Sequence, residues 1–186
     1  MAIILETERL LFREHEAEDM EAYCEMEADP EVRRYVGGKA RPRDLAEARF
    51  REVYLQPAPP DRLALWATVY KPEERYIGYC GVYPHFDADN RPIPGEGTIA
   101  YYLARPYWGR GLATEAGRAF LRFGFTELGL NRIVTLVGVG NTASLRVLEK
   151  LGLLQTGSEQ LGTRSFYSYA ITRTKWEQQE QNEGSV

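Results

Sequence analysis

Apolar positions along the chain follow two different periods, which separate the expected helices from the expected strands. Over 113–128 they recur at helical spacing, with Ala113, Ala116, Phe120 and Phe123 on or near one face. Over 132–139 the run is almost continuously apolar, as in a strand covered on both faces. On these criteria we predict strands over 7–15, 63–70, 76–83, 98–104, 132–139, 154–160 and 165–172, and helices over 19–27, 31–35, 45–55, 113–128 and 143–151.

The order of these elements predicts an α/β (α+β) fold in which helices lie on the faces of a mixed sheet. Asp, Asn, Pro and Gly gather over 87–97, which predicts a loop there. We find no repeat and no domain-scale linker, so we expect a single domain over 1–176. The polar residues 177–186 are expected to form a frayed tail.

Charge and composition exclude several classes of function. The 23 Lys and Arg residues against 27 Asp and Glu residues give a net charge of −4, which argues against a broad nucleic-acid footprint. No apolar run approaches the ~20 residues of a membrane span, and the start of the chain does not resemble a signal peptide. We therefore expect a cytoplasmic protein with reduced cysteines, Cys24 and Cys80. Two scattered histidines, His15 and His85, indicate no zinc site.

The stretch from Ile99 to Gly117 carries the clearest chemical signal. A strand-forming run, Ile-Ala-Tyr-Tyr-Leu, is followed by Pro106, by Trp-Gly-Arg-Gly-Leu-Ala, and then by the helical pattern. Glycines let the main chain approach a ligand closely, and the first N–H groups of a helix point at an anion. The three-glycine dinucleotide fingerprint and the P-loop lysine are both absent. We therefore predict a phosphate site of another kind, although the two glycines alone also fit a plain tight turn.

This stretch and three other segments of the chain resemble the GNAT N-acetyltransferases. Within that family they resemble the ribosomal-protein N-terminal (alanine/serine) acetyltransferase group. The resemblance spans nearly the whole chain. It is carried by Thr-Glu-Arg-Leu-Leu-Phe-Arg from Thr7, Asp-Pro-Glu-Val from Asp29, Tyr-Trp-Gly-Arg-Gly-Leu-Ala-Thr-Glu-Ala from Tyr107, and the segment from Asn141 to Gly152. Trp108, where the wider superfamily has Gln or Arg, fits the ribosomal-protein group. The fold implied is a mixed, mostly antiparallel central sheet flanked by helices on both faces.

The resemblance also implies acetyl-CoA as co-substrate and assigns its contacts. Backbone N–H groups of the loop and helix start would hold the pyrophosphate, the strand ending near Leu103 would pair with the pantetheine arm, and the Asn141 amide would reach it. Asn141 also suits a simple helix N-cap. The implied contact residues are Leu103, Trp108, Gly109, Arg110, Gly111, Leu112, Ala113, Thr114 and Asn141.

The acid that protonates the departing thiolate is expected to differ from that of many family members. They carry a tyrosine at the position of Leu148, and leucine cannot donate a proton. Ser144 lies one helical turn after Asn141 and on its side of the helix. We therefore assign Ser144 as acid or hydrogen-bond donor to the sulfur, against the alternative that its hydroxyl bonds its own helix backbone.

The base that takes the amine proton is the least determined role. The group commonly has a glutamate where this chain has Thr98, which cannot serve as a base. Glu96, two residues earlier, would share its strand face if pairing begins that early, so we assign it as the base. His85 on the neighbouring strand and a water chain remain alternatives, and Glu96 could instead be a solvated turn residue.

The sequence thus predicts an N-acetyltransferase in which a neutral primary amine attacks the thioester directly. The acceptor is either a protein N-terminus or a small-molecule amine, and a homodimer is a further option. The alternative is an acyl-CoA-binding module of the same fold without turnover, suggested by the missing glutamate at Thr98. A nucleotide-binding function is disfavoured because no acidic ribose-binding residue follows the glycines on a suitable strand. No metal, nucleic acid or membrane is expected as a partner.

Overall fold

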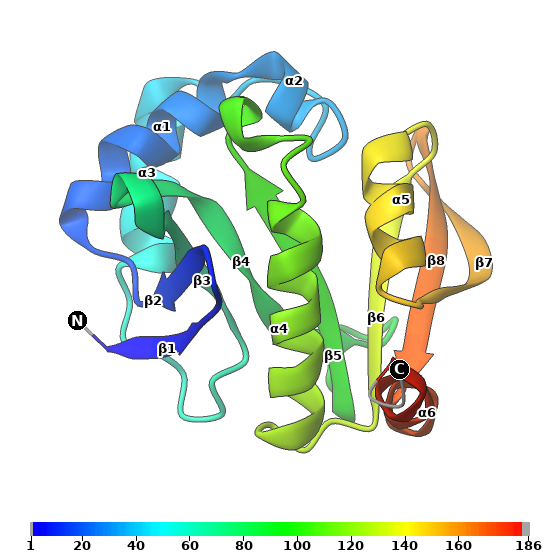
Figure 1. The fold of residues 1–186 in the computed structure, drawn as a ribbon. Coiled ribbons are helices and arrows are strands. Elements are labelled where there is room, and N and C mark those ends of the chain that lie inside the picture. The colour runs from blue at the N-terminus through cyan, green and yellow to red at the C-terminus, as the bar shows by residue number, and fades with distance from the viewer. Residues whose placement is uncertain (1, 184–186) are drawn as a thin grey trace.

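The computed structural model describes residues 2–183, and in them the chain builds one eight-stranded sheet (Figure 1). Its order is β1-β2-β3-β4-β5-β6-β8-β7. Neighbouring strands are antiparallel except for β5 and β6, which run parallel. The strands are β1 (Ile3–Glu6), β2 (Leu10–Arg13), β3 (Ala64–Tyr70), β4 (Arg75–Phe86), β5 (Pro92–Leu103), β6 (Arg132–Gly138), β7 (Leu154–Leu161) and β8 (Arg164–Thr172).

Helices cover both faces of this sheet. On one face α4 and α5 contribute to a core with β2 to β6, and on the other α1 and α3 pack over β3 and β4. The prediction of a mixed, mostly antiparallel sheet flanked by helices on both faces is confirmed. The helices are α1 (Met20–Ala28), α2 (Pro30–Arg33), α3 (Arg43–Arg49), α4 (Leu112–Thr126), α5 (Thr142–Lys150) and α6 (Arg173–Glu183). In the described part of the chain, none of them has the length and apolar character needed to cross a membrane.

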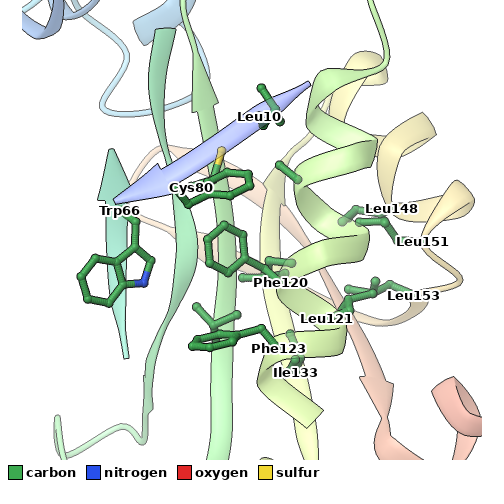
Figure 2. Packing of buried hydrophobic residues seen from close by; sticks show 14 of the residues in the cluster. Leu10, Trp66, Cys80, Phe120, Leu121, Phe123, Ile133, Leu148, Leu151 and Leu153 are labelled. Atoms are coloured by element: carbon green, nitrogen blue, oxygen red, sulfur yellow. The ribbon is translucent and has the colours of Figure 1, made fainter. Parts of the chain in front are cut away.

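The larger core fixes α4 against the sheet and α5 against α4 (Figure 2). Phe120 of α4 lies edge-on to Phe12 of β2, with ring centroids 4.8 Å apart. Where the two helices meet, a Cβ at Gly117 would lie 2.5 Å from Cδ1 of Leu151, the C-cap of α5, so any larger residue would have to displace that side chain. The N-terminus of α4 is therefore held in a fixed place beside β5.

The sheet separates into two halves between β5 and β6, as the gap beside α4 in Figure 1 illustrates. The two strands are paired only from Glu96 to Thr98 of β5, opposite Arg132 to Val134 of β6. Beyond Thr98, β5 continues along β4 to Leu103 without β6 at its other edge. The unpaired edge of β5 is the side of the molecule on which the site is built.

Four local predictions from the sequence need correction. The strand predicted over 7–15 is shorter, Leu10–Arg13, and a strand that was not predicted, Ile3–Glu6, precedes it and pairs with it. The loop predicted over 87–97 is shorter, because β5 begins at Pro92 and Phe86 pairs with it. The helix predicted over 45–55 begins at Arg43 and changes to a π-helical turn over Phe50–Tyr54.

The fourth correction concerns the polar tail predicted over 177–186. Residues 177–183 belong to α6, and residues 184–186 lie outside the described part of the chain. The helix is fixed by Trp176, whose ring lies 5.3 Å from that of Phe125, and by Arg173, which donates to the Leu130 carbonyl oxygen. The tail is helical because of these contacts and not because of an amphipathic pattern of its own.

Candidate functional site

A cleft of about 580 Å³ opens where β5 and β6 separate, and we call it the splay cleft. Its size is that of a typical small-molecule or cofactor site. It brings together the strand edge, the glycine loop and the start of α5, which the sequence places far apart. The residues that line it include Ile99 to Leu103, Trp108, Gly109, Gly111 to Thr114, Thr135 to Gly138, Asn141 to Ser144, Arg146 and Lys150.

The N-terminus of α4 faces the splay cleft with the geometry of an anion site. Gly109 and Gly111 both have left-handed backbone, with φ of 72° and 79°, and Gly111 is the N-cap of the helix. The main chain can take this path because glycine has no Cβ. The first N–H groups of α4 have no partner within the helix, so they are available to a phosphate at the cleft.

The negative charge of Glu115, in the first turn of α4, is compensated by residues of the turn between β1 and β2. Burial alone would raise the pKa of Glu115, but hydrogen bonds from Thr7 and Arg9 lower it below its usual value. The Arg9 guanidinium also donates to the carbonyl oxygen of Arg110 at 3.0 Å. The Thr7 and Arg9 side chains therefore hold both the loop and the charge balance of the anion site.

Trp108 and Arg110 occupy different parts of the loop. The indole Nε1 of Trp108 donates to the carbonyl oxygen of Leu103 at 2.7 Å, so the ring ties the loop to the end of β5. The Arg110 side chain points elsewhere: it lies over the Tyr107 ring at 5.1 Å and 3.8 Å from Glu73. Arg110 does not line the splay cleft, and a contact of its backbone with the cofactor stays a prediction.

Asn141 and Ser144 lie together at the other wall of the cleft. The Oδ1 atom of Asn141 accepts from the Ser144 backbone N–H at 3.2 Å, so Asn141 caps α5. Its amide nitrogen is a separate donor, which leaves the predicted contact with the cofactor open. Leu148, by contrast, is fully buried in the core.

Tyr101 is a cleft residue that the sequence reasoning missed. Its phenol extends from β5 toward α5 and donates to the Ser144 carbonyl oxygen at 3.4 Å. Burial raises the pKa of Tyr101 to about 12, while a hydrogen bond with the Ser144 side chain opposes the rise. Alternation along β5 places Tyr101 with Ile99 and Leu103, a signal that could have identified it. Two hydroxyl groups therefore stand side by side in the cleft.

Two exposed cations at the cleft were also missed. Arg146 and Lys150 lie one turn apart on α5, and both line the cleft. Their spacing of four residues puts them on the same face of the helix. Positive side chains at this wall suit a phosphate-bearing ligand.

A segment after α2 crosses the gap between the two halves of the sheet. The Tyr35 hydroxyl donates to the carbonyl oxygen of Gly140 at 3.0 Å. Arg164 of β8 donates to the carbonyl oxygen of Tyr35 at 2.6 Å. We call this segment, 34–36, the strap, because it joins the helical layer of the first half to the turn before α5.

A second cavity of about 490 Å³ lies beside the splay cleft, and we call it the aromatic cavity. It shares Val36 and Tyr102 with the cleft, so the two spaces meet at the unpaired edge of β5. The π-helical turn contributes Val53 and Tyr54 to its wall. Its other side chains include Glu14, His15, Arg33, Arg49, Trp66, Tyr79 and Tyr83.

The charges beneath this cavity are largely compensated. Glu27, whose side chain is only 1% exposed, binds Arg33 at 3.2 Å and Arg41 at 2.8 Å, and accepts from the Tyr79 hydroxyl. Burial lowers the pKa of His15 to about 4, although its hydrogen bond with Leu65 opposes this shift. The cavity thus combines aromatic side chains and a neutral imidazole with the charged side chains of Glu14 and Arg49. Among the described residues, no three His, Cys, Asp or Glu side chains gather in a way that could hold a metal ion.

Glu96, predicted as the base, lies outside the splay cleft. Its carboxylate is bound by Arg132 Nη1 at 3.0 and 3.2 Å. It is also 3.8 Å from Nε2 of His85, whose Nδ1 lies 3.4 Å from Thr98 Oγ1. The structure does not bring Glu96 together with Ser144, because β5 and β6 are still paired at Glu96. The role of Glu96 as base stays a prediction.

The fold and the cleft agree with a comparison against known families. Residues 9–154 match the model of the acetyltransferase (GNAT) domain. This match covers most of the chain and includes β2, the glycine loop and α5. The chain belongs to the GNAT acetyltransferase family.

Relatives and solved structures make the class more specific. An uncharacterized N-acetyltransferase, p20, of Bacillus licheniformis is 34% identical over 158 residues, which are 82% of this chain and 83% of the relative. A GNAT-family acetyltransferase structure from Bacillus anthracis matches with a TM-score of 0.78 and 26% identity, over 94% of this chain and 99% of that one. This protein is therefore an N-acetyltransferase.

A more distant structure shares the fold alone. It is the spermidine N-acetyltransferase of Vibrio cholerae in complex with CoA and spermine, with a TM-score of 0.73 and 17% identity. The alignment covers 92% of this chain and 99% of that one.

Proposed function

We propose that this N-acetyltransferase binds acetyl-CoA in the splay cleft and transfers the acetyl group to a primary amine that enters through the aromatic cavity. The observation that carries the proposal is the meeting of the two spaces at Val36 and Tyr102. There the edge of β5 has no strand partner, so its backbone is available to an extended ligand. A donor and an acceptor could therefore approach each other from two sides.

The groups that would hold acetyl-CoA belong to three elements. The N–H groups at the start of α4 would hold the pyrophosphate, as would the loop from Gly109. The edge of β5 up to Leu103 would pair with the pantetheine arm. Asn141 would donate its amide to the same arm, and Arg146 would supply positive charge for a phosphate. When bound, acetyl-CoA supplies the activated acetyl group.

The chemistry would be direct transfer between the two bound substrates. The neutral amine attacks the thioester carbonyl, and the thiolate leaves as its charge is met by a proton or hydrogen bond. Ser144 lies at the wall where such a donor is needed, and Tyr101 stands beside it. The acceptor would be a protein N-terminus, as in the ribosomal-protein group, or a small-molecule amine. A spermidine enzyme of the same fold is a precedent for the small-molecule class.

Turnover is tested by CoA thiol release with a panel of amines. The panel contains peptides with free N-termini, polyamines and an aminoglycoside, each added with acetyl-CoA. We expect saturable thiol release with at least one of these classes. Tight binding of acetyl-CoA without release for any amine would contradict turnover and support the alternative, an acyl-CoA-binding module.

The phosphate site is tested by Gly111→Val. A β-branched residue at φ of 79° is strained and crowds the phosphate, so binding of acetyl-CoA should weaken at least about tenfold, or ~1.4 kcal/mol. Calorimetry measures the change. Gly162→Val is the matched control, because Gly162 also has left-handed backbone, with φ of 60°, and a Cβ there meets nothing within 4 Å. Normal binding by Gly111→Val would show that the pyrophosphate lies elsewhere.

A further inference from the structure

Thr98 occupies the point at which the two halves of the sheet separate. It forms the last paired position between β5 and β6, opposite Val134. On its other side it pairs with Tyr83 of β4, which lines the aromatic cavity. The register of β5 with β4 is continuous from Gly97 to Leu103, so Thr98 and Tyr102 project to the same face. Tyr102 lines the aromatic cavity and Thr98 lies beside that lining, so this face is the side from which the acceptor amine would arrive.

A chain of polar groups leads away from Thr98 toward the surface. The Thr98 hydroxyl lies 3.4 Å from Nδ1 of His85. The other ring nitrogen of His85, Nε2, lies 3.8 Å from the Glu96 carboxylate. Arg132 binds that carboxylate at 3.0 Å. The groups therefore form a continuous line of hydroxyl, imidazole, carboxylate and guanidinium.

One tautomer of His85 suits this order of groups. With its N–H at Nε2, the imidazole would turn that N–H toward the Glu96 carboxylate, which lies 3.8 Å away and can only accept. Its Nδ1 lone pair then faces the Thr98 hydroxyl and can accept the hydroxyl proton. Glu96 is occupied by Arg132 and lies behind the ring, so it positions His85 and does not itself meet the amine.

The neighbouring phenol cannot replace this imidazole. Burial raises the pKa of Tyr83, although a hydrogen bond with Thr98 opposes the rise. A phenol with a raised pKa stays protonated near neutral pH and cannot accept a proton there. The groups that face His85 in this cluster are thus a neutral hydroxyl, a neutral phenol nearby, and the paired charges of Glu96 and Arg132.

We propose that Thr98 and His85 form a proton relay for the acceptor amine. The acceptor arrives as an ammonium; one of its protons passes to Thr98 Oγ1 while the Thr98 hydroxyl proton passes to His85 Nδ1. The nitrogen, now neutral, bonds to the thioester carbonyl carbon, and the proton that it must lose to become an amide passes to the departing thiolate. The carbon–sulfur bond breaks with its electron pair on sulfur. The imidazolium then returns its proton to solvent, for which its 31% exposed side chain is placed. This inference rests on the proposed function, because it needs the amine at the aromatic cavity.

The test compares kcat/KM across pH for the wild type and three variants with one aliphatic amine. Thr98→Val keeps the shape and removes the hydroxyl, Thr98→Ser restores a hydroxyl, and His85→Gln removes the base. We expect Thr98→Val and His85→Gln to lose about tenfold or more at pH 7, and the loss to shrink at high pH, where the amine is already neutral. Thr98→Ser should stay near the wild type.

Controls separate the relay from a structural role. Thr156→Val on the exposed strand β7 is the matched control for loss of a threonine hydroxyl, and it should leave the profile unchanged. All variants should bind acetyl-CoA within a few-fold of the wild type. If the cluster only stabilised the end of the sheet, the variants would lower the stability of the protein and leave the shape of the pH profile unchanged.

A second readout is independent of turnover. The chain has two histidines, so the ¹⁵N signals of His85 can be assigned with the His15→Gln variant. We expect the Nε2–H tautomer for neutral His85, and an Nδ1–H tautomer would overturn the relay. An active wild type whose variants keep its pH profile would overturn the relay alone. A wild type without thiol release for any amine would overturn the proposed function and the relay with it.

Discussion

The guanidinium of Arg9 holds the carboxylate of Glu115 at 2.7 Å, which joins the turn between β1 and β2 to the first turn of α4. The Arg9 backbone N–H and the Thr7 hydroxyl bind the other carboxylate oxygen, at 2.9 and 2.5 Å. The negative charge of the carboxylate is thereby compensated by a cation and by two further donors. This contact explains why a motif at the start of the chain accompanies a loop about 100 residues later.

Removal of this contact should weaken the binding of acetyl-CoA. In Arg9→Ala the Glu115 carboxylate would keep its charge without a partner beside the pyrophosphate, and the loop would lose its tie at Arg110. We expect the dissociation constant to rise about tenfold, or ~1.4 kcal/mol, in calorimetry.

Two further variants define the cause. Arg9→Ala combined with Glu115→Gln should recover part of the affinity, because the unpaired charge is gone. Arg91→Ala is the control, since Arg91 pairs with Asp87 in the exposed hairpin between β4 and β5. An unchanged dissociation constant for Arg9→Ala would show that this ion pair does not affect the anion site.

The two hydroxyl groups at the wall of the splay cleft should act on the departing thiolate. Ser144→Ala should lower kcat by about 10²-fold while acetyl-CoA binding stays within a few-fold, because charge on sulfur develops only during the reaction. Tyr101→Phe should also lower kcat, since a phenol with a pKa of about 12 remains a donor. Steady-state kinetics with the best acceptor, together with calorimetry, measure both quantities.

The double variant distinguishes a shared role from two separate roles. If the hydroxyls act as a unit, the double variant should lose less than the product of the single losses. Val147→Ala, on the same helix and at the same cleft, is a control without a hydroxyl. If kcat is unchanged in both single variants while chemistry is rate-limiting, the Ser144 hydroxyl would only bond the backbone of its own helix, α5.

His15 should make the folded state sensitive to acid. Its pKa is about 4 in the folded chain against an ordinary value of 6.5, so the unfolded chain binds more protons between these values. The free energy of unfolding therefore rises with pH through this window. The part that His15 contributes is lost as the pH falls from 6.5 toward 4. The shift corresponds to a contribution of ~3 kcal/mol, fully present at pH 7.

Urea unfolding at pH 4.5 and pH 7 measures this effect. The difference between the two pH values should be smaller in His15→Gln than in the wild type, because glutamine does not titrate. His85→Gln is the comparison for loss of the partly exposed imidazole. A difference for His15→Gln equal to that of the wild type would contradict the buried neutral state of His15.

The parts of the molecule that local sequence determines were predictable. Gly109 and Gly111 before an amphipathic pattern encode a left-handed turn and a helix start, and both are present. The apolar run of β6 encodes a strand, which is also present, but the expected cover on both faces is incomplete, because Leu136 is 41% exposed. In both cases the signal lies within a few residues of the element.

The parts that depend on distant contacts were not predictable. Pro92 to Gly95 read as a loop, but pairing with β4 makes them strand. The C-terminal helix has no apolar stripe, and Trp176 docks on α4 only in the folded chain. The Glu96 carboxylate is bound by Arg132, a partner 36 residues away that no spacing rule reveals.

The strap closes the second end of the opening between the two halves of the sheet. The two halves are joined at one end by the short pairing of β5 with β6, and at the other by Tyr35 and its contacts with Gly140 and Arg164. The opening is therefore a closed frame and not an open groove. If acetyl-CoA lies along the edge of β5 as proposed, its pantetheine arm would be threaded between two fixed crossings, so the strap would have to open or be passed end-on each time the cofactor is exchanged.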